Sequence, residues 1–217
     1  LFELQFDNKN SYNLKQLPNL EQFKKNNYIE KTIYLKNNTI MITQIYRKGL
    51  PLKNCKCLLY GYGSYGDSYD ANFNINKLLT LCDIGYLIVI AHISGDGRMG
   101  FNQYKNGILL NKKNTFHDFI YIIDNYLYRY NITSKEKLVI WGRSAGGLLI
   151  GAVLNMRPDI CKLAIMGVPF ISPMITMSSS KNPLGFESHS EWGNPLKDPY
   201  KEYIYSYSPY QNIQNCG

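Results

Sequence analysis

One short stretch of the chain has the residue types to form a covalent intermediate. Residues Gly142–Gly146 have the form Gly-x-Ser-x-Gly, with Ser144 at the centre. A serine hydroxyl attacks a carbonyl when a base takes its proton and nearby donors stabilise the oxyanion that forms. The apolar run at 137–141 is typical of a strand, and the apolar run at 148–154 is typical of a buried helix. This strand–turn–helix context favours a nucleophile elbow over a glycine-rich turn that contains serine by chance.

The glycines around Ser144 have a steric reason. A strand that turns sharply into a helix brings two backbones together, so we expect Gly142, Gly146 and Gly147 to lie where a Cβ atom would clash. The same turn should hold Ser144 in a strained backbone conformation at the carboxyl end of the sheet. The N–H groups at the start of the following helix could then donate to a developing oxyanion.

The elements that must position this serine alternate between strands and helices along the chain. An antiparallel hairpin comes first, and the alternation after it indicates an α/β fold with a mostly parallel sheet. A nucleophile that follows a central strand fits the α/β-hydrolase pattern. Residues 1–7 read as a lone strand, 8–26 as a polar linker, 98–114 as a loop and 170–217 as an irregular polar segment. The predicted strands are 28–35, 39–46, 55–60, 86–93, 137–141 and 163–168, and the predicted helices are 74–82, 116–130 and 148–154.

Composition narrows the class of protein further. The 217 residues are 45% hydrophobic, which is enough to bury a sizeable core. The net charge of +8 comes mostly from lysines spread among asparagines, so we interpret it as solvated surface and expect no nucleic-acid partner. We expect no membrane contact, because no apolar run reaches 18 residues. Five cysteines without zinc-site spacing favour free thiols, no metal and a cytoplasmic location.

Several longer motifs resemble the catalytic domain of the prolyl oligopeptidase family, and its oligopeptidase B branch in particular. They recur in the family's order across residues 28–213. The Ser-Tyr pair after Gly63 and the run Glu-Trp-Gly-Asn-Pro favour oligopeptidase B over the proline-specific branch. The motifs are Leu58–Gly66, Gly107–Phe116 with Asp118, Gly142–Gly147, Arg157–Asp159, Val168–Phe170, Glu191–Pro195 and Tyr207–Tyr210.

The resemblance implies roles for matching residues. Ser144 would be the nucleophile, and the Ala145 N–H and the Tyr62 hydroxyl would hold the oxyanion. One such donor contributes about 3 kcal/mol to the transition state; without the resemblance, Tyr62 would read as a packing aromatic. The substrates would be short peptides cut after Lys or Arg, and no cofactor is implied. The residues that would bind the substrate are Asp70, Glu187, Glu191 and Tyr65.

The catalytic triad departs from the family pattern. In this fold the nucleophile is followed by an aspartate and then by a histidine. His189 is the only histidine after Ser144; between them, Asp159 fits a helix end, and Glu187 is too close to His189 to come from a separate strand end. The family's triad Asp and His follow the Tyr207–Tyr210 segment, so we expect both to be missing from this chain and the isolated chain to be nearly inactive.

The ends of the domain and the specificity residues also depart from the family. We expect residues 1–26 to be a remnant of the last β-propeller strand plus a linker, with the rest of the propeller absent. Residues 27–217 would then be a partial, C-terminally incomplete α/β-hydrolase domain. Ser188 and Ser190 stand where oligopeptidase B has acidic residues, and Asn72 replaces the acidic partner of Asp70. These changes weaken the expectation of cleavage after basic residues.

Three functions therefore remain open from the sequence. The leading hypothesis is a serine oligopeptidase that forms an acyl-enzyme on Ser144. The second is an inactive fragment or pseudoenzyme that acts by binding at most. The third is an esterase or lipase, which would share the elbow but lack the Tyr-Gly-Tyr-Gly and Glu-Trp-Gly-Asn-Pro motifs.

Overall fold

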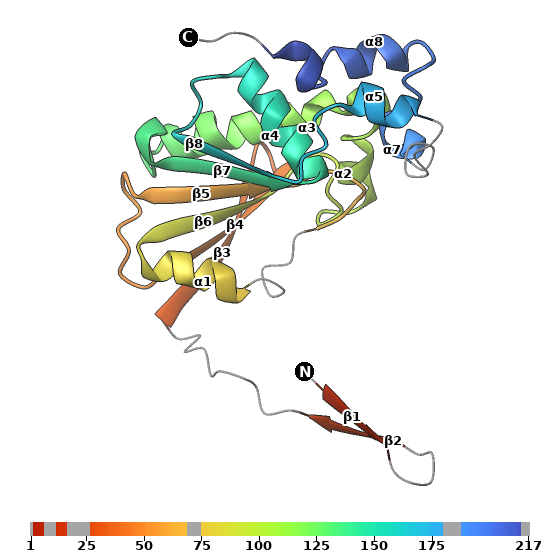
Figure 1. Cartoon of the computed structure of the whole chain (residues 1–217). Helices are drawn as coiled ribbons and strands as arrows, with labels where there is room; N and C mark the ends of the chain where they lie inside the picture. The colour runs from red at the N-terminus through yellow and green to blue at the C-terminus, as the bar shows by residue number, and fades with distance from the viewer. Residues whose placement is uncertain (1, 7–11, 17–26, 69–74, 180–187, 214–217) are drawn as a thin grey trace.

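A six-stranded sheet forms the centre of the molecule (Figure 1). The computed structural model describes residues 2–6, 12–16, 27–68, 75–179 and 188–213. The strand order β3-β4-β6-β5-β7-β8 makes the first two pairings antiparallel and the other three parallel, as the sequence predicts. The strands are β3 (Tyr28–Leu35), β4 (Ile40–Arg47), β5 (Lys56–Gly61), β6 (Tyr86–His92), β7 (Leu138–Arg143) and β8 (Leu163–Gly167).

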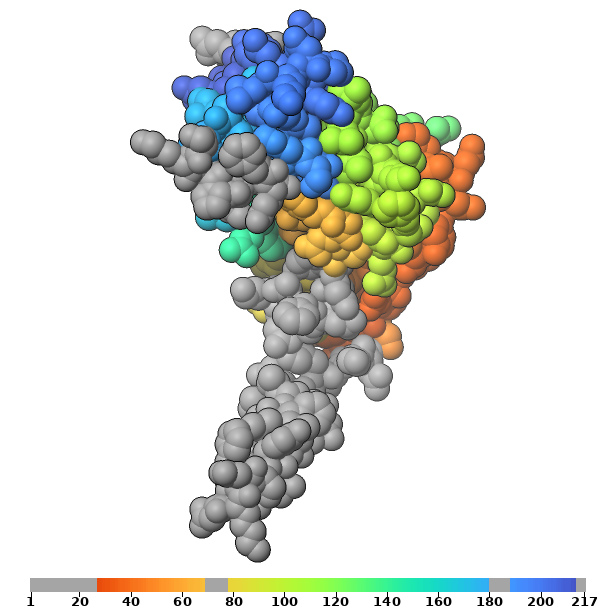
Figure 2. Space-filling model, turned by 90° about the vertical axis from the view of Figure 1, so that its right-hand side faces the viewer, coloured from red at the N-terminus to blue at the C-terminus, as the bar shows by residue number. Residues whose placement is uncertain are grey.

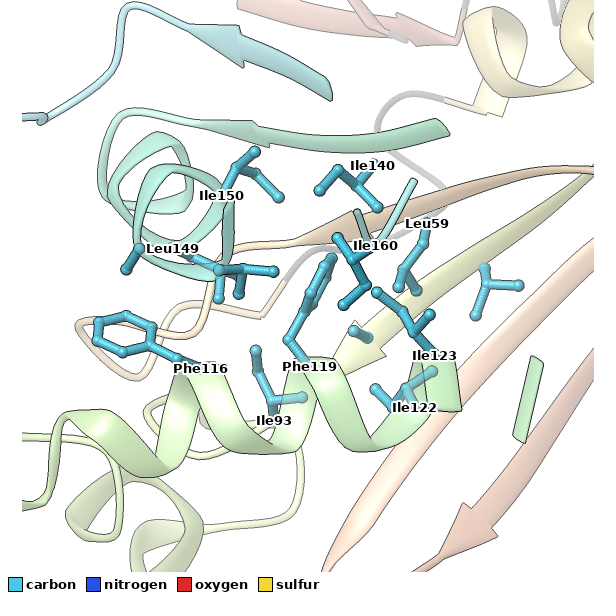
Figure 3. Close-up of a cluster of buried hydrophobic side chains, with 14 of the residues drawn as sticks. Leu59, Ile93, Phe116, Phe119, Ile122, Ile123, Ile140, Leu149, Ile150 and Ile160 are labelled. Carbon is cyan, nitrogen blue, oxygen red and sulfur yellow. The ribbon is translucent and has the colours of Figure 1, made fainter. Parts of the chain in front are cut away.

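Helices cover both faces of this sheet. Helix α1 (Ile75–Asp83) lies on one face, and α3 (Lys113–Ile122) and α4 (Ala145–Met156) lie on the other (Figure 1). Helix α3 continues as a π-helical segment over Ile123–Tyr128, so the helix predicted at 116–130 is confirmed, but it begins at Lys113 and ends at Tyr128. Each face has its own core because successive side chains of a strand point to opposite faces; Figure 3 shows the larger core, beneath α3 and α4.

Short helices fill the segments that the sequence leaves irregular. Helices of four to six residues show too little periodicity to be recognised, and tertiary packing supplies their stability. Trp192 and Ile204, for example, are fully buried. The short helices are α2 (Phe101–Lys105), α5 (Pro173–Ser178), α7 (His189–Trp192) and α8 (Tyr200–Tyr205), with 3₁₀ turns at Leu109–Asn111, Lys135–Lys137 and Tyr210–Asn212.

The N-terminal region contains a hairpin rather than a lone strand. Strand β1 (Phe2–Phe6) pairs antiparallel with β2 (Tyr12–Gln16) in a separate two-stranded sheet. The prediction of a linker over 8–26 is therefore wrong for residues 12–16. The run Tyr-Asn-Leu-Lys-Gln has only weak alternation, so its pairing with β1 decides its conformation. The domain boundary after residue 26 stays a prediction.

Three further sequence expectations concern cysteines, metals and membranes. Cys55, Cys57 and Cys82 are buried free thiols, and Cys161 is a half-buried one. Within the described ranges, no cluster of three or more His, Cys, Asp and Glu side chains has the geometry of a metal site. In the same part of the chain, no helix has the length and apolarity needed to cross a bilayer.

Candidate active site

Ser144 occupies a sharp turn between a central strand and a helix. Strand β7 ends one residue before it and α4 begins one residue after it. Its backbone has φ 56° and ψ −115°, a conformation that side-chain-bearing residues rarely adopt. Such strain costs on the order of 1–3 kcal/mol and persists when the surroundings fix it. Ser144 is exposed, so the elbow predicted from the sequence is confirmed in conformation and accessibility.

The backbone of Ser144 is held by the end of β8, by the segment that follows it and by α4. Its N–H donates to the Gly167 carbonyl at 2.9 Å. Its own carbonyl accepts the N–H of Phe170 at 3.0 Å and that of Gly147 at 2.9 Å. These three hydrogen bonds fix the strained residue from both the neighbouring strand and the helix.

The steric prediction for the glycines of the elbow is confirmed. A Cβ atom on Gly142 would lie 2.1 Å from the Gly146 carbonyl oxygen, where no side chain can fit. A Cβ on Gly146 would lie 2.5 Å from the carbonyl oxygen of Gly61, and one on Gly147 would lie 2.6 Å from Cβ of Pro169. The glycines therefore allow β7, α4 and the end of β5 to approach at backbone contact.

Tyr62 lies beside the first turn of the elbow helix. It follows β5, which pairs in parallel with β7, so both carboxyl ends meet at one edge of the sheet. The Cβ position of Gly146 is 3.3 Å from Tyr62 Cα and 3.4 Å from its ring atom Cδ2. Burial, followed by the negative charge of Asp67, raises the pKa of Tyr62 to about 12. The hydroxyl thus stays protonated at neutral pH and can donate a hydrogen bond.

Ala145 supplies a second donor by its place in the chain. It is the first residue of α4, so its N–H has no partner inside the helix. The positive end of the helix dipole lies at the same point and favours negative charge. The turn can therefore offer a backbone N–H and a phenol to one developing oxyanion.

The three histidines of the chain have other surroundings. His92 is buried, with Nε2 at 3.1 Å from Thr43 Oγ1 and Nδ1 at 3.2 Å from Asp96 Oδ2. His117 is exposed on α3 and lines a pocket of about 240 Å³ beside α4 and α8. His189 has Nε2 at 3.5 Å from the carbonyl oxygen of Met177. Within the described residues, the Ser144 hydroxyl forms no hydrogen bond to a histidine or a carboxylate.

The residues expected to bind substrate have mixed positions. Asp70 and Glu187 lie outside the described residues. Tyr65 lies in the loop after β5 and is 48% exposed, and its hydroxyl accepts the indole N–H of Trp192 at 2.9 Å. Glu191 is only 1% exposed, so the structure places this carboxylate in the interior and not on a surface that a substrate could contact.

Sequence reasoning missed Lys112, which is the buried partner of Glu191. The Lys112 side chain is 1% exposed, and its Nζ lies 3.7 Å from Glu191 Oε1. Desolvation lowers its pKa to about 8, although the Glu191 charge acts in the opposite direction. The signal was weak, since Lys112 and Lys113 stand side by side in the sequence and only the fold distinguishes them.

Comparisons with known proteins agree with this geometry. Residues 71–216 match the sequence profile of the prolyl oligopeptidase family. Dipeptidyl aminopeptidase BI of Pseudoxanthomonas mexicana is 43% identical over 81% of this chain and 24% of its own length. Protease 2 of Moraxella lacunata is 39% identical over 81% of this chain and 25% of its own length. The chain thus spans about a quarter of the length of these curated relatives.

Solved structures give the same result for the fold. The structure of oligopeptidase B from Leishmania major superposes with a TM-score of 0.80 at 36% identity. That match covers 98% of this chain and 30% of the solved one. The mostly parallel sheet and its covering helices are therefore those of an α/β-hydrolase fold.

Proposed function

Because the chain belongs to the prolyl oligopeptidase family of peptidases, we propose that it carries the nucleophile and oxyanion donors of a serine-type peptidase. The observation that carries the proposal is the exposed Ser144 at φ 56°, with Tyr62 packed beside the same helix turn. A sharp turn of this kind has no structural need for a serine at its tip, whereas acyl transfer needs one.

The proposed reaction is acyl transfer from a peptide to Ser144. The hydroxyl oxygen attacks the peptide carbonyl carbon, and a general base accepts the hydroxyl proton. The carbonyl oxygen becomes an oxyanion that accepts hydrogen bonds from the Ala145 N–H and the Tyr62 hydroxyl. The amine product leaves with a proton, and water then hydrolyses the ester on Ser144. In this family's pattern the base is a histidine that follows the nucleophile in the chain.

The substrates we propose are short peptides cut after Lys or Arg. Similarity to an oligopeptidase B structure supports this class, and Asp70 and Glu187 remain candidate partners for a basic side chain. Glu191 is withdrawn from that role, because its carboxylate is buried against Lys112. A relative named dipeptidyl aminopeptidase makes release of dipeptides from a free amino terminus the second candidate.

Labelling with a fluorophosphonate probe tests the nucleophile. We expect the protein as it is naturally produced to be labelled stoichiometrically at Ser144, because the turn exposes this hydroxyl beside two oxyanion donors. Tryptic mass spectrometry identifies the labelled residue, and Ser144→Ala is the matched control. Labelling at another serine, or none in folded protein, contradicts the proposal. Fast labelling of the isolated 217-residue chain would show that it holds its own base.

Peptide substrates with paired ends test the specificity. Fluorogenic peptides with Lys, Arg or Pro before the cut are compared, each with a free and an acetylated amino terminus. We expect Lys and Arg to give the highest kcat/KM in both forms. Activity restricted to dipeptides with a free amino terminus would favour the second candidate. Preference for Pro would refute cleavage after basic residues.

A further inference from the structure

The loop that carries Tyr62 is enclosed by two segments distant in sequence. Figure 2 shows the loop after β5, in amber, at the surface between the α2–α3 region in green and the C-terminal helices in blue. Three residues after Tyr62 are left-handed, with φ +66° at Gly63, +61° at Tyr65 and +66° at Gly66. The Asp67 N–H donates to the Ser64 carbonyl oxygen within the loop and the Gly66 N–H to the Gly95 carbonyl oxygen outside it, so the remaining backbone groups need other partners.

Lys112 provides the partners on one side. Its buried Nζ donates to the Gly63 carbonyl oxygen at 2.6 Å and to the Ser64 hydroxyl at 2.8 Å. Both acceptors belong to the two residues that follow Tyr62 directly. The ammonium group therefore fixes the direction of the Gly63 carbonyl, in the residue that follows Tyr62.

Glu191 provides the partner on the other side. Its Oε1 accepts the Tyr65 N–H at 2.8 Å and lies 3.7 Å from Lys112 Nζ. The Trp192 ring centroid lies 4.4 Å from the same ammonium group, a cation–π contact. The lysine and the glutamate thus hold the Gly63 carbonyl and the Tyr65 N–H while neutralising each other.

A buried ion pair is a costly way to hold a loop. Desolvating two charges costs several kcal/mol, and a well-packed apolar pair is often as stable or more stable. The depressed pKa of Lys112 reflects that cost. What the pair provides is directional control of two peptide groups, which an apolar pair cannot give. That control matters where a displacement of about 1 Å can change a rate 10²-fold.

We propose that Lys112 is a positioning residue for the oxyanion donor Tyr62, acting together with Glu191 through the Gly63–Tyr65 backbone. The proposal rests on the proposed serine peptidase function. Lys112 touches neither substrate nor Ser144 in this arrangement. It holds the loop so that the Tyr62 hydroxyl stays beside the first turn of α4, where it can meet the oxyanion.

A double-mutant cycle between Lys112 and Tyr62 tests this coupling in the naturally produced protein. The substrate is a fluorogenic Arg peptide, and kcat and KM are measured separately. We expect Tyr62→Phe to lower kcat by about 10²–10³-fold, as loss of one oxyanion donor does. Lys112→Met should lower kcat by 10-fold or more with KM within about twofold, and should add less than about threefold to Tyr62→Phe. Multiplicative effects in the double variant, or a change confined to KM, would overturn the proposal.

One control variant and one replacement variant make the outcome decisive. Lys113→Met removes the neighbouring lysine, whose Nζ lies over the Tyr203 ring at 5.2 Å, and should leave kcat within about twofold. If Lys112→Met does not fold, Glu191→Gln replaces it, because glutamine keeps the shape but removes the negative charge that favours the Lys112 ammonium group. Glu191→Gln should then show the same non-additivity with Tyr62→Phe, and simple multiplication would again refute the coupling.

Hydrogen exchange separates this proposal from the function on which it rests. If Ser144 is not labelled by a fluorophosphonate in the wild-type protein, the proposed function is wrong. Amide exchange of a peptide covering 62–67 still reports whether Lys112 holds the loop. We expect exchange at Tyr65 to rise at least tenfold in Lys112→Met and not in Lys113→Met. Equal exchange in both variants would show that Lys112 does not hold the loop.

Discussion

At the scale of single residues, the chemistry depends on backbone conformation as much as on side-chain type. Ser144 is exposed because its φ of 56° directs it away from both the strand and the helix. Tyr62 keeps its proton because burial raises its pKa to about 12. Lys112, the third of these residues, carries its charge in the protein interior, where burial disfavours the charged form. Each property follows from the residue's surroundings and cannot be read from its identity alone.

The buried ammonium of Lys112 makes stability depend on pH. Its pKa is about 8 in the folded protein, below its usual value of 10.5, because burial disfavours the charged form. Between these two pH values the unfolded chain binds the proton and the folded chain does not, so the free energy of unfolding rises with pH. Relative to Lys112→Met, the wild type should gain up to about 3 kcal/mol between pH 7 and 10.5.

Urea unfolding at the two pH values measures this gain. Taking the difference between the wild type and Lys112→Met cancels titrations that the two proteins share. A difference in unfolding free energy that does not change with pH would show that Lys112 titrates normally.

The sequence indicates the proposed nucleophile more readily than the residues that support its surroundings. Ser144 stands in a five-residue pattern between a predicted strand and a predicted helix, and Gly142 in it has a local steric cause, so the local sequence is sufficient to predict the turn. Lys112 and Glu191 meet across 79 positions of sequence, and no local pattern predicts such an approach. Burial is also a property of the fold and not of the local sequence. For that reason the sequence suggested Glu191 as a substrate-binding residue.

At the scale of elements, the junction of β7 and α4 has no room for an added side chain. The carbonyl oxygen of Gly146 occupies the space where a Cβ of Gly142 would lie, at 2.1 Å. A side chain there must push the first turn of α4 away from the strand. Both Ser144 and the Ala145 N–H would move with that turn.

Gly142→Ala should therefore destabilise the protein and reduce its reactivity together. We expect a loss of about 2–3 kcal/mol in unfolding free energy, the usual scale for overpacking, and at least tenfold slower fluorophosphonate labelling. Gly167→Ala is the matched control, because its Cβ would have ordinary contacts of 3.5 Å or more. Thermal unfolding and labelling rates measure both effects. Equal behaviour of the two variants would contradict the steric account.

Strands and long helices were predictable, whereas short helices were not. β4, β5 and β6 are largely buried on both faces, so β5 and β6 are mostly apolar runs and β4 has apolar residues on both sides of its Thr and Gln. Helices α2 and α7 have five and four residues, too few for a helical repeat. Strand β2 was missed because its sequence alternates only weakly and its partner, β1, lies across a turn.

At the scale of the whole molecule, the two edges of the main sheet differ. Strand β3 at one edge is the outer half of a hairpin, and its side chains are partly or fully exposed. Strand β8 at the other edge exposes large apolar side chains, with Leu163 at 52% and Ile165 at 43%. Among the described strands, β8 pairs only with β7, so its outer N–H and C=O groups form an open edge.

Charges on β8 should reduce association of the isolated 217-residue chain. Leu163→Lys with Ile165→Glu replaces two apolar residues that are each about half exposed, so the unfolding free energy should change by no more than about 1 kcal/mol. Static light scattering at fixed concentration should show a lower mean mass than for the wild type. Asn102→Lys with Asn106→Glu, at exposed positions outside the sheet, is the control for charge alone because it also adds one charge of each sign. An unchanged mean mass in the β8 variant would show that association uses another surface.

The loop that carries Tyr62 and its partner Glu191 are far apart in sequence, so they are synthesised at different times. The Tyr65 N–H finds its acceptor on Glu191, which the ribosome adds 126 residues later. At the usual rate of bacterial or eukaryotic synthesis, that interval is about 6 to 25 s. During that interval the nascent chain can already form β5 and the early helices, while the loop that carries Tyr62 still lacks its hydrogen bond to Glu191. The loop that carries Tyr62 can therefore reach its final geometry only after residue 191 has been synthesised, when all six strands of the main sheet have already been made.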